Sequence, residues 1–101
     1  MAIKAFVLIE TAMGKVREVV AALEKVDGVK SVEAVTGPYD VIATVELPDV
    51  SAVGELVTKH IQSVVGIART VTCFAIRLIL TYPVAVNVYP VVSHLYDAFY
   101  Q

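Results

Sequence analysis

Side chains alternate between two faces along residues 3–10, which is the period of a β-strand. Both faces of this strand carry large apolar residues in the middle, so both faces are expected to be covered. Three more strands are predicted where the chain is apolar and rich in β-branched residues, at Val29–Thr36, Asp40–Leu47 and Ile67 to about Leu80. The chain therefore supplies four strands.

Two further segments repeat their apolar residues at the spacing of a helix. Lys15–Asp27 is predicted to be the first helix, and its buried stripe consists of Val16, Val19, Val20, Leu23 and Val26. The second helix is predicted to follow Pro48, with Asp49 or Ser51 as its N-cap. Its buried stripe consists of Val53, Leu56, Val57, Ile61 and Val64. Gly28 and Gly66 are expected to end the two helices.

The resulting order, β-α-β-β-α-β, has two halves that echo each other about 38 residues apart, with Gly28 matching Gly66. This order predicts an α+β, ferredoxin-like fold with a four-stranded antiparallel sheet, strand order 4-1-3-2, and both helices on one face. The face of the sheet away from the helices would carry Phe6, Leu8, Val32 or Ile42, depending on the register between the strands. Such an apolar patch, on the order of several hundred Å², predicts face-to-face dimerisation of the α/β-barrel type.

The stretch VTGPYDVIATVE, residues 35–46, reads as a strand, a tight turn and a strand. Pro38 fixes its own φ angle and favours an extended Gly37. Asp40 can tie the backbone of this turn, and Tyr39 points an amphipathic ring outward. We expect the turn to face a small-molecule site between subunits.

The character of the chain changes after residue 80, which divides it into a domain at 1–80 and an extension at 81–101. The extension has one charged residue, Asp97, and it is rich in tyrosine. We expect it to pack on the sheet edge or on a neighbouring subunit, since disorder favours polar and charged sequence. Leu78–Tyr96 is uncharged and long enough to span a membrane, but Pro83 and Pro90 argue against a span.

Composition supports self-association, because 57% of the 101 residues are hydrophobic, more than one small core needs. The net charge is −2 and the eight basic residues are scattered, which argues against a nucleic-acid surface. The one cysteine excludes an internal disulfide and fits a reducing cytoplasm. The start of the chain resembles neither a signal peptide nor a transit peptide. These features predict a cytoplasmic protein without a membrane or nucleic-acid partner.

The sequence shows no recognisable catalytic set, metal site or cofactor motif, neither a phosphate loop nor zinc-ligand spacing. His60 and His94 lie far apart in sequence, and His60 falls at the border of a buried stripe, where a partly buried structural histidine is expected. Cys73 alternates among apolar residues and is expected to be a packing residue. We therefore predict a protein that is not an enzyme.

Four runs of sequence resemble the ligand-binding (RAM) domain of the Lrp/AsnC, or feast/famine, family of transcriptional regulators. They are AFVLIET followed by GKVREVVAAL, then DGVKSVEAVTGPYDVIATVE, then ELVTKHIQSVVGI, and a closing TVT. The most specific is VTG-x-YD-x-x-A-x-VE, and together they cover residues 5–73. Members of that family carry a DNA-binding helix-turn-helix ahead of this domain. The chain here starts at the first strand, so it resembles a stand-alone version.

The resemblance implies a face-to-face dimer, dimers assembled into a ring such as an octamer, and an amino acid bound between dimers. By motif position the ligand would contact the turn and the last strand, at Gly37, Tyr39, Asp40, Thr70 and Thr72. Asp40 can accept from an ammonium group, while hydroxyls and turn amides can donate to a carboxylate. The residues alone favour an ordinary turn cap at Asp40 and ordinary strand threonines, and it is the resemblance that favours a site.

Three functions are compatible with these observations. The first is a sensor that binds an amino acid or a similar metabolite without an enzymatic step and changes assembly state, for example by joining full-length regulators of the same family. The second is a small dimeric α+β barrel enzyme of the monooxygenase type, which would need His60 or His94 inside a closed pocket. The third is a purely structural oligomerisation module whose aromatic tail makes the contacts.

Overall fold

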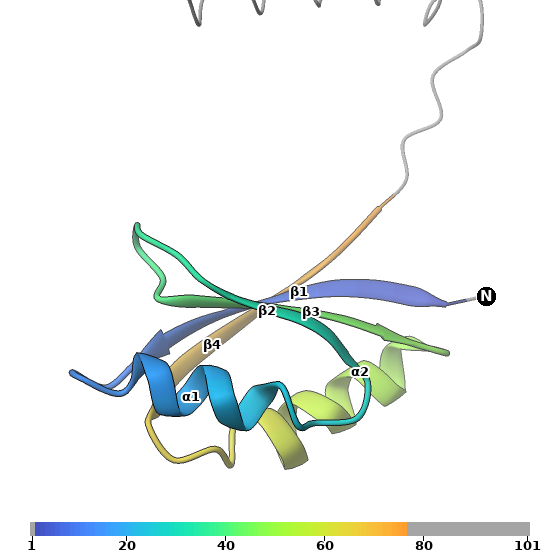
Figure 1. The fold of residues 1–101 in the computed structure, drawn as a ribbon. Coiled ribbons are helices and arrows are strands. Elements are labelled where there is room, and N and C mark those ends of the chain that lie inside the picture. Colours follow the sequence, from blue (N-terminus) through green and yellow to red (C-terminus); the bar gives the residue numbers. More distant parts are fainter. Residues whose placement is uncertain (1, 77–101) are drawn as a thin grey trace, which may run out of the picture.

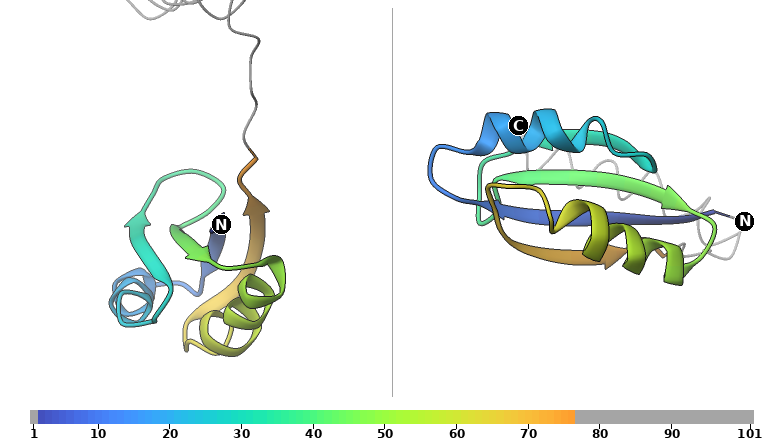
Figure 2. Two further views of the ribbon diagram at one scale, coloured as in Figure 1. Left: turned by 90° about the vertical axis from the view of Figure 1, so that its right-hand side faces the viewer. Right: turned by 90° about the horizontal axis from the view of Figure 1, so that it is seen from below.

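The computed structural model describes residues 2–76. They form β1 (Ile3–Thr11), α1 (Val16–Leu23), β2 (Val29–Ala34), β3 (Val41–Leu47), α2 (Val50–Leu56), η1 (Val57–Ile61) and β4 (Ile67–Phe74). One sheet carries all four strands, and both helices lie on the same side of it (Figure 1). The two views of Figure 2 show this two-layer arrangement from the end and from below. The predicted βαββαβ fold is confirmed.

The strands lie in the order β2-β3-β1-β4, and each neighbouring pair is antiparallel. This is the predicted order, read from the opposite edge. The register places Ile9 opposite both Val41 on β3 and Thr70 on β4. Directly opposite residues share a face of a sheet, so the register fixes which side chains meet the helices.

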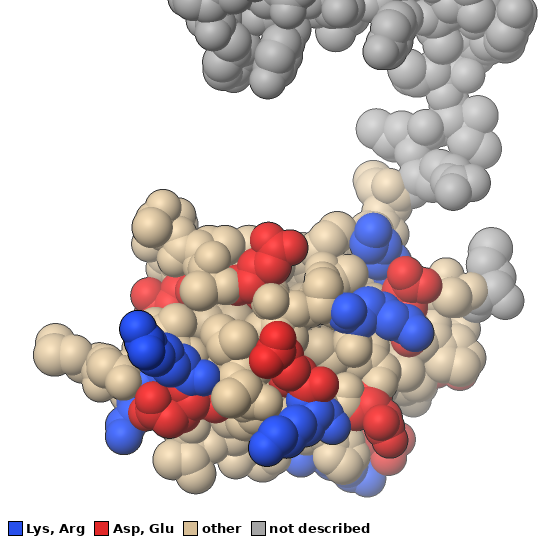
Figure 3. Space-filling view, in the orientation of Figure 1, with Lys and Arg blue, Asp and Glu red and all other residues tan. Residues whose placement is uncertain are grey.

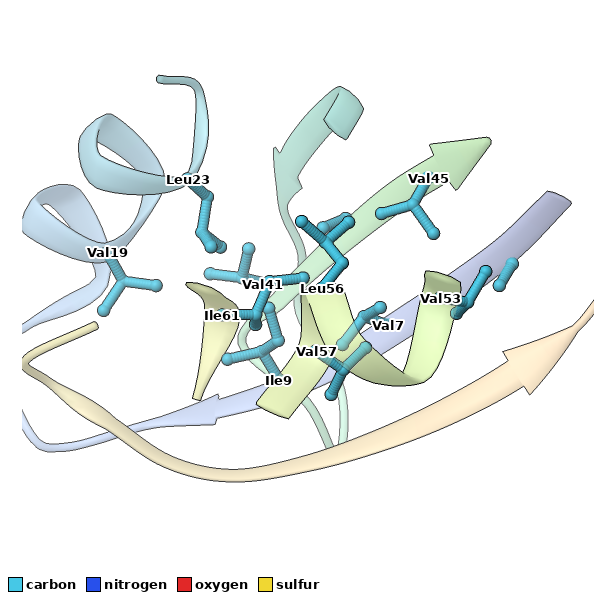
Figure 4. Close-up of a cluster of buried hydrophobic side chains, with 12 residues drawn as sticks. Val7, Ile9, Val19, Leu23, Val41, Val45, Val53, Leu56, Val57 and Ile61 are labelled. Carbon is cyan, nitrogen blue, oxygen red and sulfur yellow. The ribbon is translucent and has the colours of Figure 1, made fainter. Parts of the chain in front are cut away.

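The core fills the space between the sheet and the helices (Figure 4). The buried residues come from the central strands and from the helix stripes, and they are Ala5, Val7, Ile9, Val19, Leu23, Val41, Ala43, Val45, Val53, Leu56, Val57 and Ile61. Val32 also packs against this cluster. Both predicted helix stripes are therefore confirmed, and the register removes Val32 from the candidates for the opposite face.

The second helix differs from the prediction because its last turn is a π-helix, η1. It begins as predicted, since Asp49 is the N-cap and its side chain accepts from the backbone N–H of Ala52 at 2.7 Å. The backbone N–H of Gln62 donates to the carbonyl of Val57, five residues earlier, at 2.8 Å. One extra residue therefore enters the helix before it ends.

Gly66, which was predicted to end this helix, lies instead in the turns between the C-cap Gln62 and β4, and it has a φ of +103°. An added Cβ would lie 3.0 Å from Cβ of Lys15 and 3.1 Å from a methyl group of Val19. The backbone N–H of Ala12 donates to its carbonyl at 2.7 Å. Glycine is needed here both for its backbone conformation and for the close approach of the turn before α1.

Several predicted boundaries were too long. The regular helix α1 stops at Leu23 rather than Asp27, and turns carry the chain to β2. Val26 lies in one of those turns and still packs on the core. For this reason its spacing in the sequence matches that of the helix although it lies beyond the helix end. β4 ends at Phe74 within the described residues. The predicted strand end at residues 77–80, the extension at 81–101 and the uncharged stretch at 78–96 lie outside them.

Candidate functional site

The VTGPYD stretch connects β2 to β3 through a loop at residues 35–40, wider than the predicted tight turn. Its ends are tied where the backbone N–H of Val35 donates to the carbonyl of Asp40 at 2.9 Å. The loop rises on the side of the sheet away from the helices (Figure 1). Gly37 has a φ of +139°, a conformation that favours glycine, and the Tyr39 side chain is half-buried.

Asp40 fixes the base of this loop to the end of β1. Its backbone N–H donates to the carbonyl of Ile9 at 2.9 Å. Its carboxylate atom Oδ2 accepts from the backbone N–H of Thr11 at 2.8 Å and from the Thr11 hydroxyl at 3.3 Å. The sequence predicted that Asp40 would tie the backbone of its own turn, and this is wrong for its side chain, which reaches across 29 residues of chain.

Thr11 is thus a residue of this site that the sequence did not reveal. The β1–β4 register shifts between Glu10 and Thr11, so the regular ladder ends where Asp40 supplies an acceptor. A local pattern shows the apolar alternation of β1 but carries no sign of this long-range pair. The carboxylate of Asp40 is consequently held in place at the end of the sheet.

Thr70 and Thr72 lie on β4, opposite Ile9 and Val7, both of which are completely buried under the helices. The two threonines therefore lie on the helix face of the sheet, and both are half-buried. The hydroxyl oxygen of Thr70 accepts from the side-chain amide of Gln62 at 3.0 Å. Gln62 was also missed, because the π turn that places it is invisible in a 3.6-residue pattern.

The structure brings the five predicted site residues together in two groups rather than one. Gly37, Tyr39 and Asp40 belong to the loop beside β3, and Thr70 and Thr72 belong to β4. β1 lies between β3 and β4, so the two backbones are about 10 Å apart. Within one chain the width of β1 therefore separates the loop residues from the two threonines.

Three of the surface hollows lined by described residues lie elsewhere. The one of about 380 Å³ is lined by Lys25, Val26, Asp27, His60 and Ser63. The other two, of about 340 and 240 Å³, lie near Lys30, at the ends of β2 and β3. His60 is exposed, so the prediction that it would be partly buried is wrong. His94 lies outside the described residues.

Within residues 2–76, no three His, Cys, Asp or Glu side chains gather in a way that could hold a metal ion. No helix in that range is both long and apolar enough to cross a membrane. On the face seen in Figure 3, acidic and basic side chains are interspersed rather than gathered by sign. This face therefore has no concentrated positive charge of the kind that binds nucleic acid.

The outer face of the sheet, away from the helices, has an apolar centre. By the register its central residues are Phe6, Leu8, Ile42, Val71 and Cys73. Cys73 is exposed, and the other four are half-buried. Cys73 was predicted to be a packing residue, and within one subunit it is not one. Charged residues surround this centre: Lys4, Glu10, Glu33, Glu46 and Arg69. An apolar centre with a polar rim is the usual anatomy of a protein interface.

Comparison with known proteins gives a consistent result. A family model described as the Lrp/AsnC ligand binding domain matches residues 4–84. The crystal structure of TTHA0845 from Thermus thermophilus is 39% identical, with a TM-score of 0.72, and the match covers 78% of this chain and 99% of that one. Hypothetical protein PHS023 from Pyrococcus horikoshii is 36% identical, with a TM-score of 0.69 and coverage of 77% and 93%.

A more distant structure shares the fold. It is the transcriptional regulator NMB0573 from Neisseria meningitidis in complex with L-Met, 23% identical with a TM-score of 0.68. The match covers 78% of this chain and 53% of that one. No curated protein matches the chain.

Proposed function

Because the chain belongs to the Lrp/AsnC ligand-binding domain family, we propose that it binds a free amino acid or a similar small metabolite at a site formed between subunits. The observation that carries this proposal is the fixed carboxylate of Asp40. It is held by Thr11 at the partly buried end of the sheet, at the base of the loop that bears the family-like motif. The similar regulator from Neisseria meningitidis forms a complex with L-Met, which supports an amino acid as the ligand.

The proposed contacts follow from the charges of a free amino acid. Its ammonium group needs an acceptor, and the Asp40 carboxylate retains lone pairs beyond the two hydrogen bonds from Thr11. Its carboxylate needs donors, which hydroxyl groups such as those of Thr70 and Thr72 supply. Tyr39 would wall the ligand side chain, and Gly37 would let the loop backbone approach. In this proposal the loop and the threonines come from different subunits.

We further propose that two copies pair through the outer face of the sheet. The apolar centre of that face, around Phe6 and Leu8, would then be covered, while the charged rim would remain in contact with water. Dimers would assemble further, into a ring such as an octamer, so that loops and β4 strands of different dimers meet. Full-length regulators of the family are candidate partners in mixed assemblies.

This role is regulatory rather than catalytic. The enzyme alternative needs His60 or His94 in a closed pocket. His60 is exposed at the rim of an open hollow with Lys25 and Asp27, which disfavours it as the catalytic histidine, and His94 lies outside the described residues. The family model that matches the chain is described as a ligand binding domain. A change of assembly state on ligand binding would be the output of such a domain.

Calorimetry with each of the twenty amino acids tests the proposal. At least one is expected to bind, and Asp40→Asn is expected to weaken that binding by about tenfold to a hundredfold, because a hydrogen bond to a charged group is lost. The asparagine keeps an oxygen that can accept from Thr11, so the loop should stay in place. Asp27→Asn, which removes a carboxylate at the distant hollow, is the matched control and should bind normally.

Two results would contradict the proposal. One is the absence of binding by all twenty amino acids at millimolar concentration. The other is an Asp40→Asn variant that binds as tightly as the unmodified chain.

A further inference from the structure

We infer that Gln62 is a positioning residue of the amino-acid site, because it holds the hydroxyl of Thr70 in the orientation that donates to the ligand carboxylate. The inference rests on the proposed function and extends it. Gln62 lies in the family-like run ELVTKHIQSVVGI but is not among the predicted site residues.

The hydrogen bond between the two side chains defines the geometry. The amide nitrogen Nε2 of Gln62 donates to Oγ1 of Thr70 at 3.0 Å. A hydroxyl has one hydrogen to donate and two lone pairs that accept. With one lone pair occupied by the amide, the hydrogen of Thr70 is directed away from Gln62. The hydroxyl therefore presents a donor to anything that approaches β4 from this side.

The π turn is what brings Gln62 to this position. Its backbone N–H bonds to Val57 rather than to Thr58, as a regular α-helix would require. The added residue rotates Gln62 by about 100° around the helix axis compared with a regular helix. Ile61 remains completely buried on the core side, while Gln62 reaches β4. Single π turns within helices occur frequently at functional sites.

The neighbouring polar side chains do not share this geometry. The hydroxyl of Thr58 donates to the carbonyl of Gly54 at 2.9 Å, and that of Ser63 donates to the carbonyl of Lys59 at 2.8 Å. Both bonds stay within the helix. Among the side-chain hydrogen bonds of residues 2–76, the one from Gln62 is the link between this helix and β4.

The orientation of the amide decides what Thr70 can do. If Gln62 presented its oxygen instead, the Thr70 hydroxyl would donate to it and would have only lone pairs left for a ligand. Those would repel a carboxylate. Replacing Gln62 by glutamate imposes that second arrangement, because a carboxylate only accepts. Replacing it by lysine keeps a donor at the end of the side chain.

The test compares these variants by calorimetry, using the amino acid that binds tightest in the panel of twenty and its C-terminal amide. Q62E and T70V should each weaken binding of the amino acid by about tenfold to a hundredfold. Q62K should bind at least as tightly as the unmodified chain. Ser63→Ala is the matched control, since its hydroxyl bonds only within the helix, and it should bind normally.

The double variant Q62E/T70V separates positioning from simple charge repulsion. If Gln62 acts through Thr70, the double variant should bind no more weakly than T70V alone. The C-terminal amide lacks the carboxylate, so Q62E should change its dissociation constant little. The inference is overturned if Q62E binds the amino acid as tightly as the unmodified chain does. It is also overturned if adding Q62E to T70V weakens binding by the same factor as Q62E alone. Absence of binding by the unmodified chain would instead remove the proposed function, and this inference with it.

Discussion

The two faces of the sheet are built from the same strands, yet they differ in how far one subunit covers them. Val7 and Ile9 of β1 are completely buried beneath the helices. Their sequence neighbours Phe6 and Leu8 are half-buried on the outer face, although they are at least as large and as apolar. The helix face is explained by the fold of one chain. The outer face is explained only if something else covers it, and a second copy of the chain is the simplest candidate.

The largest expected effect comes from placing a charge in the centre of the outer face. Leu8→Lys should abolish association, raising the dissociation constant of the dimer by more than about a hundredfold, because each copy buries an unpaired charge. The fold should survive, since Leu8 is outside the core cluster. Light scattering measures the mass, and Ala21→Lys on the exposed face of α1 is the control. A dimer that persists in Leu8→Lys would show that the copies do not pair through the outer face.

Truncation of the core should be nearly as costly, but to folding rather than association. Ile9→Ala removes a completely buried side chain and should lower the free energy of unfolding by about 2–5 kcal/mol. Leu8→Ala, its neighbour on the other face, should cost about 1 kcal/mol when the protein is dilute enough to be a monomer. Urea denaturation of both variants gives the difference. Equal losses would show that the two faces are not distinct.

Whether a feature of this structure could be predicted from the sequence depends on how far apart along the chain the interacting residues lie. The strand order, the helix stripes and the Asp49 cap were predictable because each depends on neighbouring residues or on periodicity. The link between Asp40 and Thr11 joins residues 29 positions apart, and no local pattern indicates it. Gln62 was missed for a different reason, since one inserted residue breaks the period on which the prediction relied.

The candidate site shows the same limit. The family resemblance named five candidate contact residues, and the structure places Gly37, Tyr39 and Asp40 in one loop. The predicted strand order already placed β4 and β3 on opposite sides of β1. The pattern could not show that Thr70 lies on the helix face, because faces are fixed by the register of the whole sheet. Whether the two groups meet is a property of the assembly rather than of one chain.

The smallest expected effect concerns the charged rim. Nε of Arg69 lies 3.6 Å from a carboxylate oxygen of Glu10, and both side chains are exposed to solvent. Arg69→Gln should change the free energy of unfolding by less than about 0.5 kcal/mol, because water and salt screen exposed pairs. Thermal unfolding at low and high salt measures it. A loss above about 1 kcal/mol would place this pair inside an interface rather than at its rim.

The reactivity of Cys73 with a thiol reagent reports directly on whether the outer face is covered, because this cysteine is exposed on that face of a single subunit, opposite Phe6. If a second copy covers that face, the labelling rate should fall as the protein concentration rises, in step with the dimer mass from light scattering. In Leu8→Lys the rate should stay high at every concentration. A dimer in which Cys73 reacts as fast as it does in the monomer would show that the second copy does not cover the outer face.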